Sequence, residues 1–309
     1  MPPYAFFHKQ FMPLSEAKVG ILTHALHYGT ACFEGIRGNW DSEREGFCLF
    51  RIKDHYERML NGCRILKINL PHSVEELCQL TAKLVERSGY REDVYIRPLA
   101  YKSSEIIGVR LHNLEDDFFI VVTTLPPYLG GESVRCCTSS WRRVDDTMIP
   151  ARGKICGIYV NSALARTEAW GNGFDEAILL TQDGHVSEGS GENIFLVRQG
   201  KLVTPSLADN ILEGITRDSV MKLAKNELGM DTIERQVDRS ELYLADECFF
   251  TGTAANIAPI AEIDHRPVGI GEIGKITKQL QELFAEVMLG RNPKYSEWYY
   301  VLCPKALKV

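Results

Sequence analysis

The sequence lacks the features that mark several large classes of protein. It has no apolar run of about 18 residues, as a membrane-spanning helix needs, and no run of basic residues. Because the chain carries a net charge of −6 at pH 7, we do not expect it to bind nucleic acid. None of the nine cysteines are spaced as C-x-x-C, and no third ligand accompanies His24 and His27. We therefore expect neither a disulfide framework nor a metal site.

What is present is an ordinary globular composition. The 309 residues are 45% hydrophobic and 25% charged, and a chain of this length predicts about two domains. The N-terminus has neither a basic leader nor a long apolar segment, so no signal peptide is expected. Cys48, Cys78 and Cys248 sit in apolar runs, as reduced and buried thiols do. These features predict a cytoplasmic protein without a membrane partner.

One segment predicts a domain boundary. Residues 126–131 contain paired prolines and paired glycines, and both interrupt regular secondary structure. We expect a small N-terminal domain over residues 1–125, an interdomain loop over 126–133 and a large C-terminal domain over 134–309.

Apolar periodicity predicts mixed helices and strands. Ser73 and Glu76 form a capping box at the start of one helix, Thr216 is expected to cap another, and Gly229 is expected to end it. Helices are expected at 51–68, from 73, and at 158–170, 216–227 and 272–289; strands are expected at 94–101, 118–125, 134–140, 176–180, 193–197, 248–250 and 257–263. Because the two types do not alternate regularly, the expected fold class is α+β.

The most informative stretch runs from His185 to Phe195 and places Glu188 in a Gly/Ser-rich turn that opens into a hydrophobic strand. Loops at strand ends are where a rigid sheet presents catalytic groups. Lys154 lies 34 residues earlier, among small and apolar neighbours that suit a partly buried amine nucleophile. An isolated acidic residue or lysine is usually a solvated surface group, so these two gain meaning only from their companions.

The companions are groups that can hold a phosphate. Gly214-Ile215-Thr216 stands at a predicted helix start, where unsatisfied N–H groups and the helix dipole favour an anion. Thr253, between Gly252 and Ala254, offers a hydroxyl and amides in a second small-residue turn. Arg58 could clamp a phosphate through two parallel hydrogen bonds.

Together these motifs resemble those of the fold-type IV pyridoxal-phosphate aminotransferases. The resemblance extends from His24 to the last long helix. Phe33-Glu34-Gly35-Ile36-Arg37 and Tyr95-Ile96-Arg97-Pro98 make the sequence similar to the branched-chain amino acid aminotransferases within that family. The resemblance implies two domains: a smaller N-terminal α/β sandwich, and a larger C-terminal domain with a mixed β-sheet or barrel core and flanking helices.

The resemblance also implies roles for individual residues. Lys154 would bond pyridoxal 5'-phosphate covalently and move the substrate proton, and Glu188 would pair with the protonated pyridine nitrogen. Tyr159 would contact the phenolic oxygen of the ring, and Arg97 would meet the distal carboxylate of glutamate. Cofactor binding is implied for Arg58, Lys154, Tyr159, Glu188, Ile215, Thr216 and Thr253, and substrate binding for Tyr28, Phe33, Tyr95, Arg97, Tyr128, Ala254 and Ala255.

The implied activity is transamination of leucine, isoleucine and valine with 2-oxoglutarate, by a ping-pong route through pyridoxamine phosphate. A homodimer or higher homo-oligomer is also implied. The sequence departs from the family at Asn256, where glutamate is frequent, and at Leu125, where some relatives have an aromatic residue. These departures bear on the substrate range.

Two alternatives stay open at this point. The chain could be another fold-type IV enzyme: a D-amino acid or (R)-amine aminotransferase, or an aminodeoxychorismate lyase. It could also be a nucleotide-binding module, because Gly269-x-Gly271-x-x-Gly274 matches a dinucleotide fingerprint. That match lies too close to the C-terminus for a βαβ unit to follow, so a loop entering the last helix is the favoured interpretation.

Overall fold

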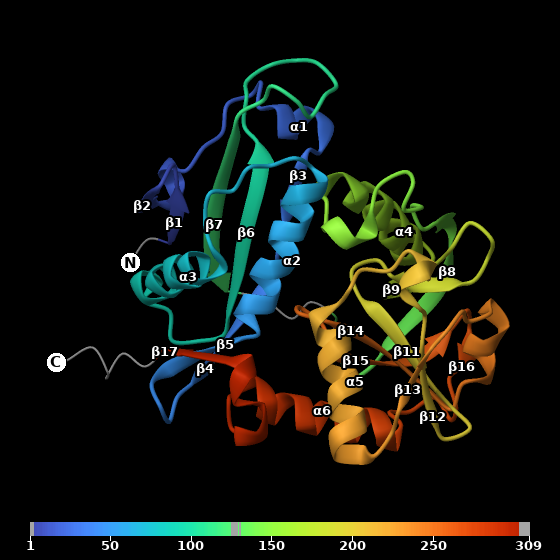
Figure 1. Cartoon of the computed structure of the whole chain (residues 1–309). Coiled ribbons are helices and arrows are strands. Elements are labelled where there is room, and N and C mark those ends of the chain that lie inside the picture. Colours follow the sequence, from blue (N-terminus) through green and yellow to red (C-terminus); the bar gives the residue numbers. More distant parts are fainter. Residues whose placement is uncertain (1–2, 125–128, 130, 303–309) are drawn as a thin grey trace. The chain divides into compact units, whose positions relative to one another are not determined.

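The computed structural model describes residues 3–124, 129 and 131–302 (Figure 1). By its contacts the chain divides into two units. The N-terminal unit comprises residues 1–126, 152–157 and 286–309, and the C-terminal unit comprises residues 127–151 and 158–285. The sequence had placed Lys154 and the chain's end in the C-terminal domain, whereas both group with the N-terminal unit. Their partners explain the difference, since Phe33 N donates to Lys154 O and the last strand pairs inside the N-terminal sheet.

The N-terminal unit is built on an eight-stranded sheet in which every pair is antiparallel. The order is β17-β5-β4-β6-β7-β1-β2, and β3 pairs with β6. The strands are β1 (Tyr4–Phe7), β2 (Gln10–Pro13), β3 (Ala31–Phe33), β4 (Ile36–Asp41), β5 (Gly46–Phe50), β6 (Val94–Lys102), β7 (Asp116–Thr124) and β17 (Tyr299–Leu302).

The helices of this unit are α1 (His24–Tyr28), α2 (Ile52–Ile65) and α3 (Val74–Ser88). The predicted capping box at Ser73 and Glu76 is present at the start of α3. Helix α2 packs against α3 and β3, and α3 packs against β1 and β7. Because α2 buries His55 as well as apolar side chains, it brings a titratable group into the interior.

The last strand is not among the strands expected from the sequence. Strand β17 pairs with β5 along residues 47–50. Trp298 precedes it and packs edge-on against Phe50 at 5.9 Å between ring centroids. The end of the described chain therefore completes the edge of the first sheet.

The C-terminal unit is built on a nine-stranded mixed sheet, in the order β10-β9-β8-β15-β14-β11-β12-β13, with β16 paired to β15. The pairs β8/β9, β8/β15 and β12/β13 are parallel, and the others are antiparallel. The strands are β8 (Val134–Arg142), β9 (Glu176–Leu180), β10 (Val186–Gly189), β11 (Asn193–Arg198), β12 (Lys201–Thr204), β13 (Thr232–Glu234), β14 (Glu247–Gly252), β15 (Asn256–Ile263) and β16 (Arg266–Pro267).

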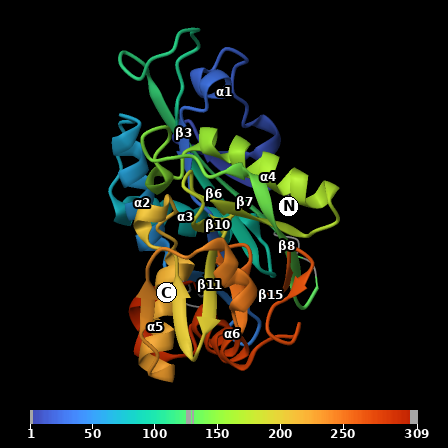
Figure 2. The same cartoon turned by 90° about the vertical axis from the view of Figure 1, so that its right-hand side faces the viewer.

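Three helices accompany this sheet: α4 (Tyr159–Gly171), α5 (Ile215–Leu228) and α6 (Lys275–Met288), the last of which extends into the N-terminal unit. Helix α4 packs against β8 and β9, whereas α5 packs against β13 and β14; α4 and β8 are seen side by side in Figure 2. One core cluster of this unit is formed by strand and loop residues, among which Ile178, Ile194 and Phe250 are fully buried. The α+β class is confirmed.

Candidate active site

Four of the predicted residues lie together in the N-terminal unit. Tyr95 and Arg97 are two positions apart on β6 and therefore point to the same face. The Arg97 guanidinium lies 4.4 Å from the centre of the Phe33 ring, and its Nη2 donates to the Tyr95 hydroxyl at 2.8 Å. On the same Phe33 ring the Lys154 Nζ lies 4.9 Å from the centroid. An amine, a guanidinium and two aromatic rings thus share one small region.

The backbone at Lys154 is unusual. Its φ of +43° lies in the left-handed region, which a residue with a Cβ rarely adopts. Neighbouring chain segments approach closely here: a Cβ at Gly62 on α2 would lie 2.5 Å from the carbonyl oxygen of Gly153. Such strain persists only when surrounding structure enforces it, and it gathers at functional sites. Lys154 itself is half-buried.

Arg58 is held by a buried carboxylate. Its Nε and Nη2 donate to the two oxygens of Glu34, both at 2.7 Å, and His55 Nδ1 lies 2.8 Å from Glu34 Oε2. Burial alone would raise the pKa of Glu34, but the charge and hydrogen bonds of Arg58, with help from His55, hold it well below its usual range. Burial lowers the pKa of His55. Because an ionised carboxylate only accepts, His55 donates, and Glu34 fixes the guanidinium in place.

Tyr28, the last residue of α1, is held by a different loop. Its hydroxyl accepts from the Gly108 amide at 3.0 Å, and the ring of His24 packs against its ring in a tilted arrangement, at 4.6 Å between centroids. His24 in turn contacts the Gly108 carbonyl at 2.9 Å. The histidine that could have suggested a metal ligand therefore holds the 104–109 loop against α1.

In the C-terminal unit Glu188 is the centre of a buried polar network. It lies on β10, and its Oε1 accepts from Arg143 Nη2 at 2.6 Å. Its Oε2 accepts from Asn193 Nδ2 at 2.9 Å and from the Leu212 amide at 3.0 Å. A buried charge needs such partners. This glutamate is therefore not the solvated surface residue that an isolated acidic residue would usually be.

The start of α5 lies beside this network. Asn193 also donates to the Leu212 carbonyl at 3.0 Å, and a Cβ at Gly214 would come within 1.9 Å of Asn193 Oδ1. Only glycine fits there. The predicted cap at Thr216 is wrong, because α5 begins at Ile215 and its N-cap is Gly214, which has no side chain to cap with. The hydroxyl of Thr216, inside the first turn, is thus not used as a cap.

The turn from β14 to β15 lies at the same end of the sheet. Thr251, near the end of β14, is in register with Asn193 at the start of β11. Its hydroxyl oxygen is buried and has no hydrogen-bond partner among the described residues. Beyond it, Thr253, Ala254 and Ala255 form the connecting turn. The strand pairing therefore gathers the β10, α5 and β14 motifs, which lie far apart in the sequence.

The departure at Asn256 has a physical explanation. Asn256 closes the turn and opposes Gly252 across the strand pair, with a φ of +55°. Asparagine tolerates the left-handed region better than glutamate does. The residue therefore suits the backbone of this turn.

The remaining predicted residues are placed as follows. Tyr159 is the first residue of α4 and belongs to the C-terminal unit, whereas Lys154 belongs to the N-terminal unit. Leu125 and Tyr128 lie outside the described residues, as does half of the expected interdomain loop.

Sequence reasoning missed the residues that hold the predicted ones in place. Glu34 and Asn193 stood inside motifs already singled out, but neither had been given a role. His55 could have been found by its spacing, since it lies one helical turn before Arg58 on α2. Arg143 carried no local signal, because its partner lies 45 residues further along the chain.

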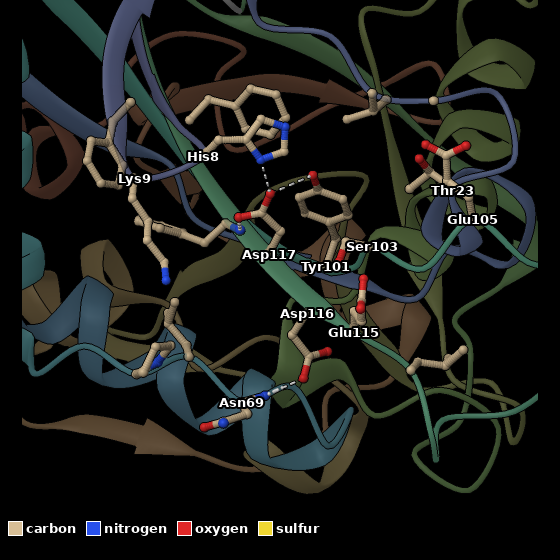
Figure 3. Close-up of a pocket in the computed structure, with 18 of the residues that line it drawn as sticks. His8, Lys9, Thr23, Asn69, Tyr101, Ser103, Glu105, Glu115, Asp116 and Asp117 are labelled. Carbon is tan, nitrogen blue, oxygen red and sulfur yellow. Dashed lines mark hydrogen bonds and ion pairs between the residues drawn. The ribbon is translucent and has the colours of Figure 1, made fainter.

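A separate cavity of about 830 Å³ lies in the N-terminal unit (Figure 3). His8, Lys9, Tyr101, Glu105 and Asp117 are among its lining residues, and none of the predicted site residues line it. Three of its titratable side chains already have partners, as His8 pairs with Asp117 at 2.8 Å and Asp116 accepts from the Asn69 amide at 2.9 Å. The site predicted from the motifs is therefore a different region.

Comparison with known proteins identifies the family. Residues 31–263 match the model of the class IV amino-transferases. A probable branched-chain-amino-acid aminotransferase of Aquifex aeolicus is 49% identical over 296 residues, covering 96% of this chain and 95% of the relative. The chain belongs to the class IV aminotransferases. That prediction from the motifs is confirmed, and the nucleotide-binding alternative is not supported.

Solved class IV aminotransferases share the whole fold. The branched-chain aminotransferase of Thermoproteus uzoniensis, crystallised with norvaline, has a TM-score of 0.93 and 42% identity, covering 97% of this chain and 99% of that one. The T.th. branched-chain amino acid aminotransferase, complexed with N-(5'-phosphopyridoxyl)-L-glutamate, has a TM-score of 0.91 and 41% identity, covering 97% and 98%.

The described residues lack two kinds of feature. None of their helices combines the length and the apolar character needed to cross a bilayer. Within the same part of the chain, no cluster of three or more histidine, cysteine, aspartate or glutamate side chains could hold a metal ion.

Proposed function

We propose that this class IV aminotransferase transfers the amino group of leucine, isoleucine or valine to 2-oxoglutarate, with pyridoxal 5'-phosphate as its cofactor. The products are the branched-chain 2-oxo acids and L-glutamate. The observation that carries the proposal is near-full-length identity of 49% to a probable branched-chain-amino-acid aminotransferase. Relatives solved with norvaline and with a phosphopyridoxyl glutamate support one site for an aliphatic and an acidic substrate.

The residues present fit this cofactor. Lys154 is half-buried and has a strained backbone. Glu188 supplies a buried carboxylate, and the start of α5 requires a glycine, Gly214. Lys154 would bond the aldehyde, Glu188 would face the ring nitrogen and Tyr159 the phenolic oxygen. The phosphate would be held by Arg58, Ile215, Thr216 and Thr253. When bound, the cofactor supplies an electron sink for the bond broken at the substrate Cα.

The substrate-binding residues also fit. The Arg97 Nε is buried without a hydrogen-bond partner among the described residues, so a carboxylate bound there would satisfy it. Phe33, Tyr28 and Tyr128 would form apolar walls for a branched side chain. The Ala254 and Ala255 amides, together with the Tyr95 hydroxyl, would receive the α-carboxylate.

Each residue then has a defined task in the reaction. Lys154 Nζ takes the proton from the substrate Cα and later returns a proton, as a positioned general base and acid does. Glu188 keeps a negative charge beside the ring nitrogen, and Arg58 keeps a positive charge at the phosphate. The two half-reactions follow in ping-pong order, because the second substrate enters only after the first 2-oxo acid has left.

We also propose that the chain works as a homodimer or larger homo-oligomer. Segments 19–26 and 104–109 are joined by the Thr23–Glu105 bridge and by the bond from His24 N to Ser104 O. They expose seven large hydrophobic side chains, which we call the α1 surface: Val19, Ile21, Leu22, Leu26, Ile106, Ile107 and Val109. Exposed apolar groups gathered in this way mark interaction surfaces.

A charge in the α1 surface tests the oligomer. Ile21→Asp should lower the mass measured by sedimentation, since Ile21 is 83% exposed in the chain. Ile270→Asp is the matched control, because Ile270 is 86% exposed in the other unit. Equal masses for the two variants and the wild type would contradict this surface as the interface.

The cytoplasmic location stays a prediction.

The activity is tested with purified protein loaded with pyridoxal 5'-phosphate. Leucine and 2-oxoglutarate should yield glutamate, and Lys154→Ala should give no measurable turnover. Borohydride reduction followed by mass spectrometry should find a phosphopyridoxyl group on Lys154 only. A preference for D-amino acids or (R)-amines, or pyruvate release from aminodeoxychorismate, would instead identify another enzyme of the same fold type.

A further inference from the structure

Arg143 is fixed at both its backbone and its side chain. Immediately after β8, its amide donates to the Leu180 carbonyl at 2.8 Å, and its carbonyl accepts from Gln182 Nε2 at 2.9 Å. Its side chain is buried; Nε donates to the Asn210 carbonyl at 3.2 Å and Nη2 lies 2.6 Å from Glu188 Oε1. The guanidinium is therefore held in one orientation by groups from separate segments.

Asn193 constrains the other oxygen of the same carboxylate. Its Nδ2 donates both to Glu188 Oε2 at 2.9 Å and to the Leu212 carbonyl at 3.0 Å. The Leu212 amide adds a third donor to Glu188. Both oxygens of Glu188 thus have donors whose own positions are fixed, which leaves the carboxylate little freedom to rotate.

We infer that Arg143 is a positioning residue, assisted by Asn193, that keeps Glu188 ionised and in one orientation toward the ring nitrogen of the cofactor. This inference rests on the proposed function. Charge and shape both matter, because Nε and Nη2 bind different acceptors at once. A lysine ammonium, as a single point of charge, cannot reproduce both contacts.

The first test is the visible spectrum of the resting, cofactor-loaded protein as a function of pH. Arg143→Met removes the buried cation, so Glu188 should take up a proton more readily. The pH midpoint of the cofactor absorbance change should then move by about one unit, a tenfold change in proton affinity. Arg142→Met is the matched control, because the neighbouring Arg142 is exposed and the same charge is lost. It should leave the midpoint unchanged.

Steady-state kinetics provide the second readout. A residue that acts through Glu188 alters the chemical step, so Arg143→Met should lower kcat about 10- to 100-fold with KM for leucine changed less than about threefold. Arg143→Lys should fall between the wild type and Arg143→Met. In a Glu188→Gln background Arg143→Met should have little additional effect on kcat, since two residues that act as a unit are not additive.

The outcomes separate the inference from the function. If wild-type protein binds no pyridoxal 5'-phosphate, the proposed function fails. If wild-type protein is active but Arg143→Met matches Arg142→Met in spectrum and kcat, only the inference is overturned. Should Arg143→Met fail to fold, Arg143→Lys and Asn193→Ser take its place. Wild-type spectra for both of these variants would overturn the inference.

Discussion

Each of the two units contains a buried carboxylate paired with an arginine at a predicted site residue, but the supporting residue is the carboxylate in one unit and the arginine in the other. In the N-terminal unit Glu34 holds Arg58, and the cation is the predicted functional group. In the C-terminal unit Arg143 holds Glu188, and the anion is the predicted functional group. Under the proposed function, the same kind of ion pair would prepare a positive group for a phosphate in one unit and a negative group for a ring nitrogen in the other.

The two carboxylates, Glu34 and Glu188, also differ in their remaining hydrogen-bond partners. Glu34 has a second titratable partner in His55, so the positive group is backed by a cluster that can respond to pH. Glu188 is completed by an amide side chain and a backbone amide, neither of which titrates in the working range of an enzyme. The surroundings of Arg58 thus include a side chain that can change its protonation state, whereas the donors around Glu188 do not.

The largest expected effect is on stability and is common to both units. Glu34→Ala leaves Arg58, whose side chain is only 10% exposed, without its carboxylate, and Glu188→Ala does the same to the buried Arg143. Breaking a buried ion pair on one side costs about 3–5 kcal/mol. Urea unfolding of the cofactor-free protein should show losses of that order for both. Glu57→Ala, at an exposed position of α2, should lose less than about 0.5 kcal/mol.

Turnover should separate the two carboxylates. Glu188→Gln removes the charge beside the ring nitrogen and should lower kcat roughly 100-fold, as the loss of one preorganised electrostatic partner does. Glu34→Gln should mainly weaken binding of pyridoxal 5'-phosphate, by about tenfold, and largely preserve kcat at saturating cofactor. Fluorescence titration and steady-state kinetics measure the two effects. Equal losses of kcat would mean that the two carboxylates do not differ in role.

The smallest effect concerns pH. The pKa of His55 is lowered in the folded protein, so the unfolded state binds more protons once the pH falls below about 6.5. Stability should decline from there toward the lower folded pKa. Glu34, whose pKa is also lowered, should add its own loss only below about 4.3. His55→Gln should abolish the first decline and keep the second in urea titrations.

Exposed His112 supplies the control for this measurement. His112→Gln should retain both declines. A wild-type protein whose stability is flat between pH 7 and 5 would contradict the assignment to His55.

Local sequence patterns predicted most of the helices and strands, but they did not predict the β1/β2 turn or the pairing of strands far apart in the sequence. The capping box at Ser73 predicted the start of α3, because its hydrogen bonds join residues three apart. The β1/β2 hairpin was not predicted, since its turn uses His8 and Lys9, both at positive φ, in place of the usual asparagine and glycine. Strand β17 was missed because its partner β5 lies about 250 residues earlier.

The sequence by itself determined the family and the fold class, because the family's residues stand in short motifs, and the same motifs predict the residues that would meet cofactor and substrate. Only the tertiary structure decided which unit holds Lys154 and which side chains support Arg58 and Glu188. Glu34 lies 24 residues from Arg58, and Arg143 lies 45 residues from Glu188. Burial makes these partners obligatory, since a charge removed from water needs a counter-charge, but only strand pairing and helix packing choose which residue supplies it.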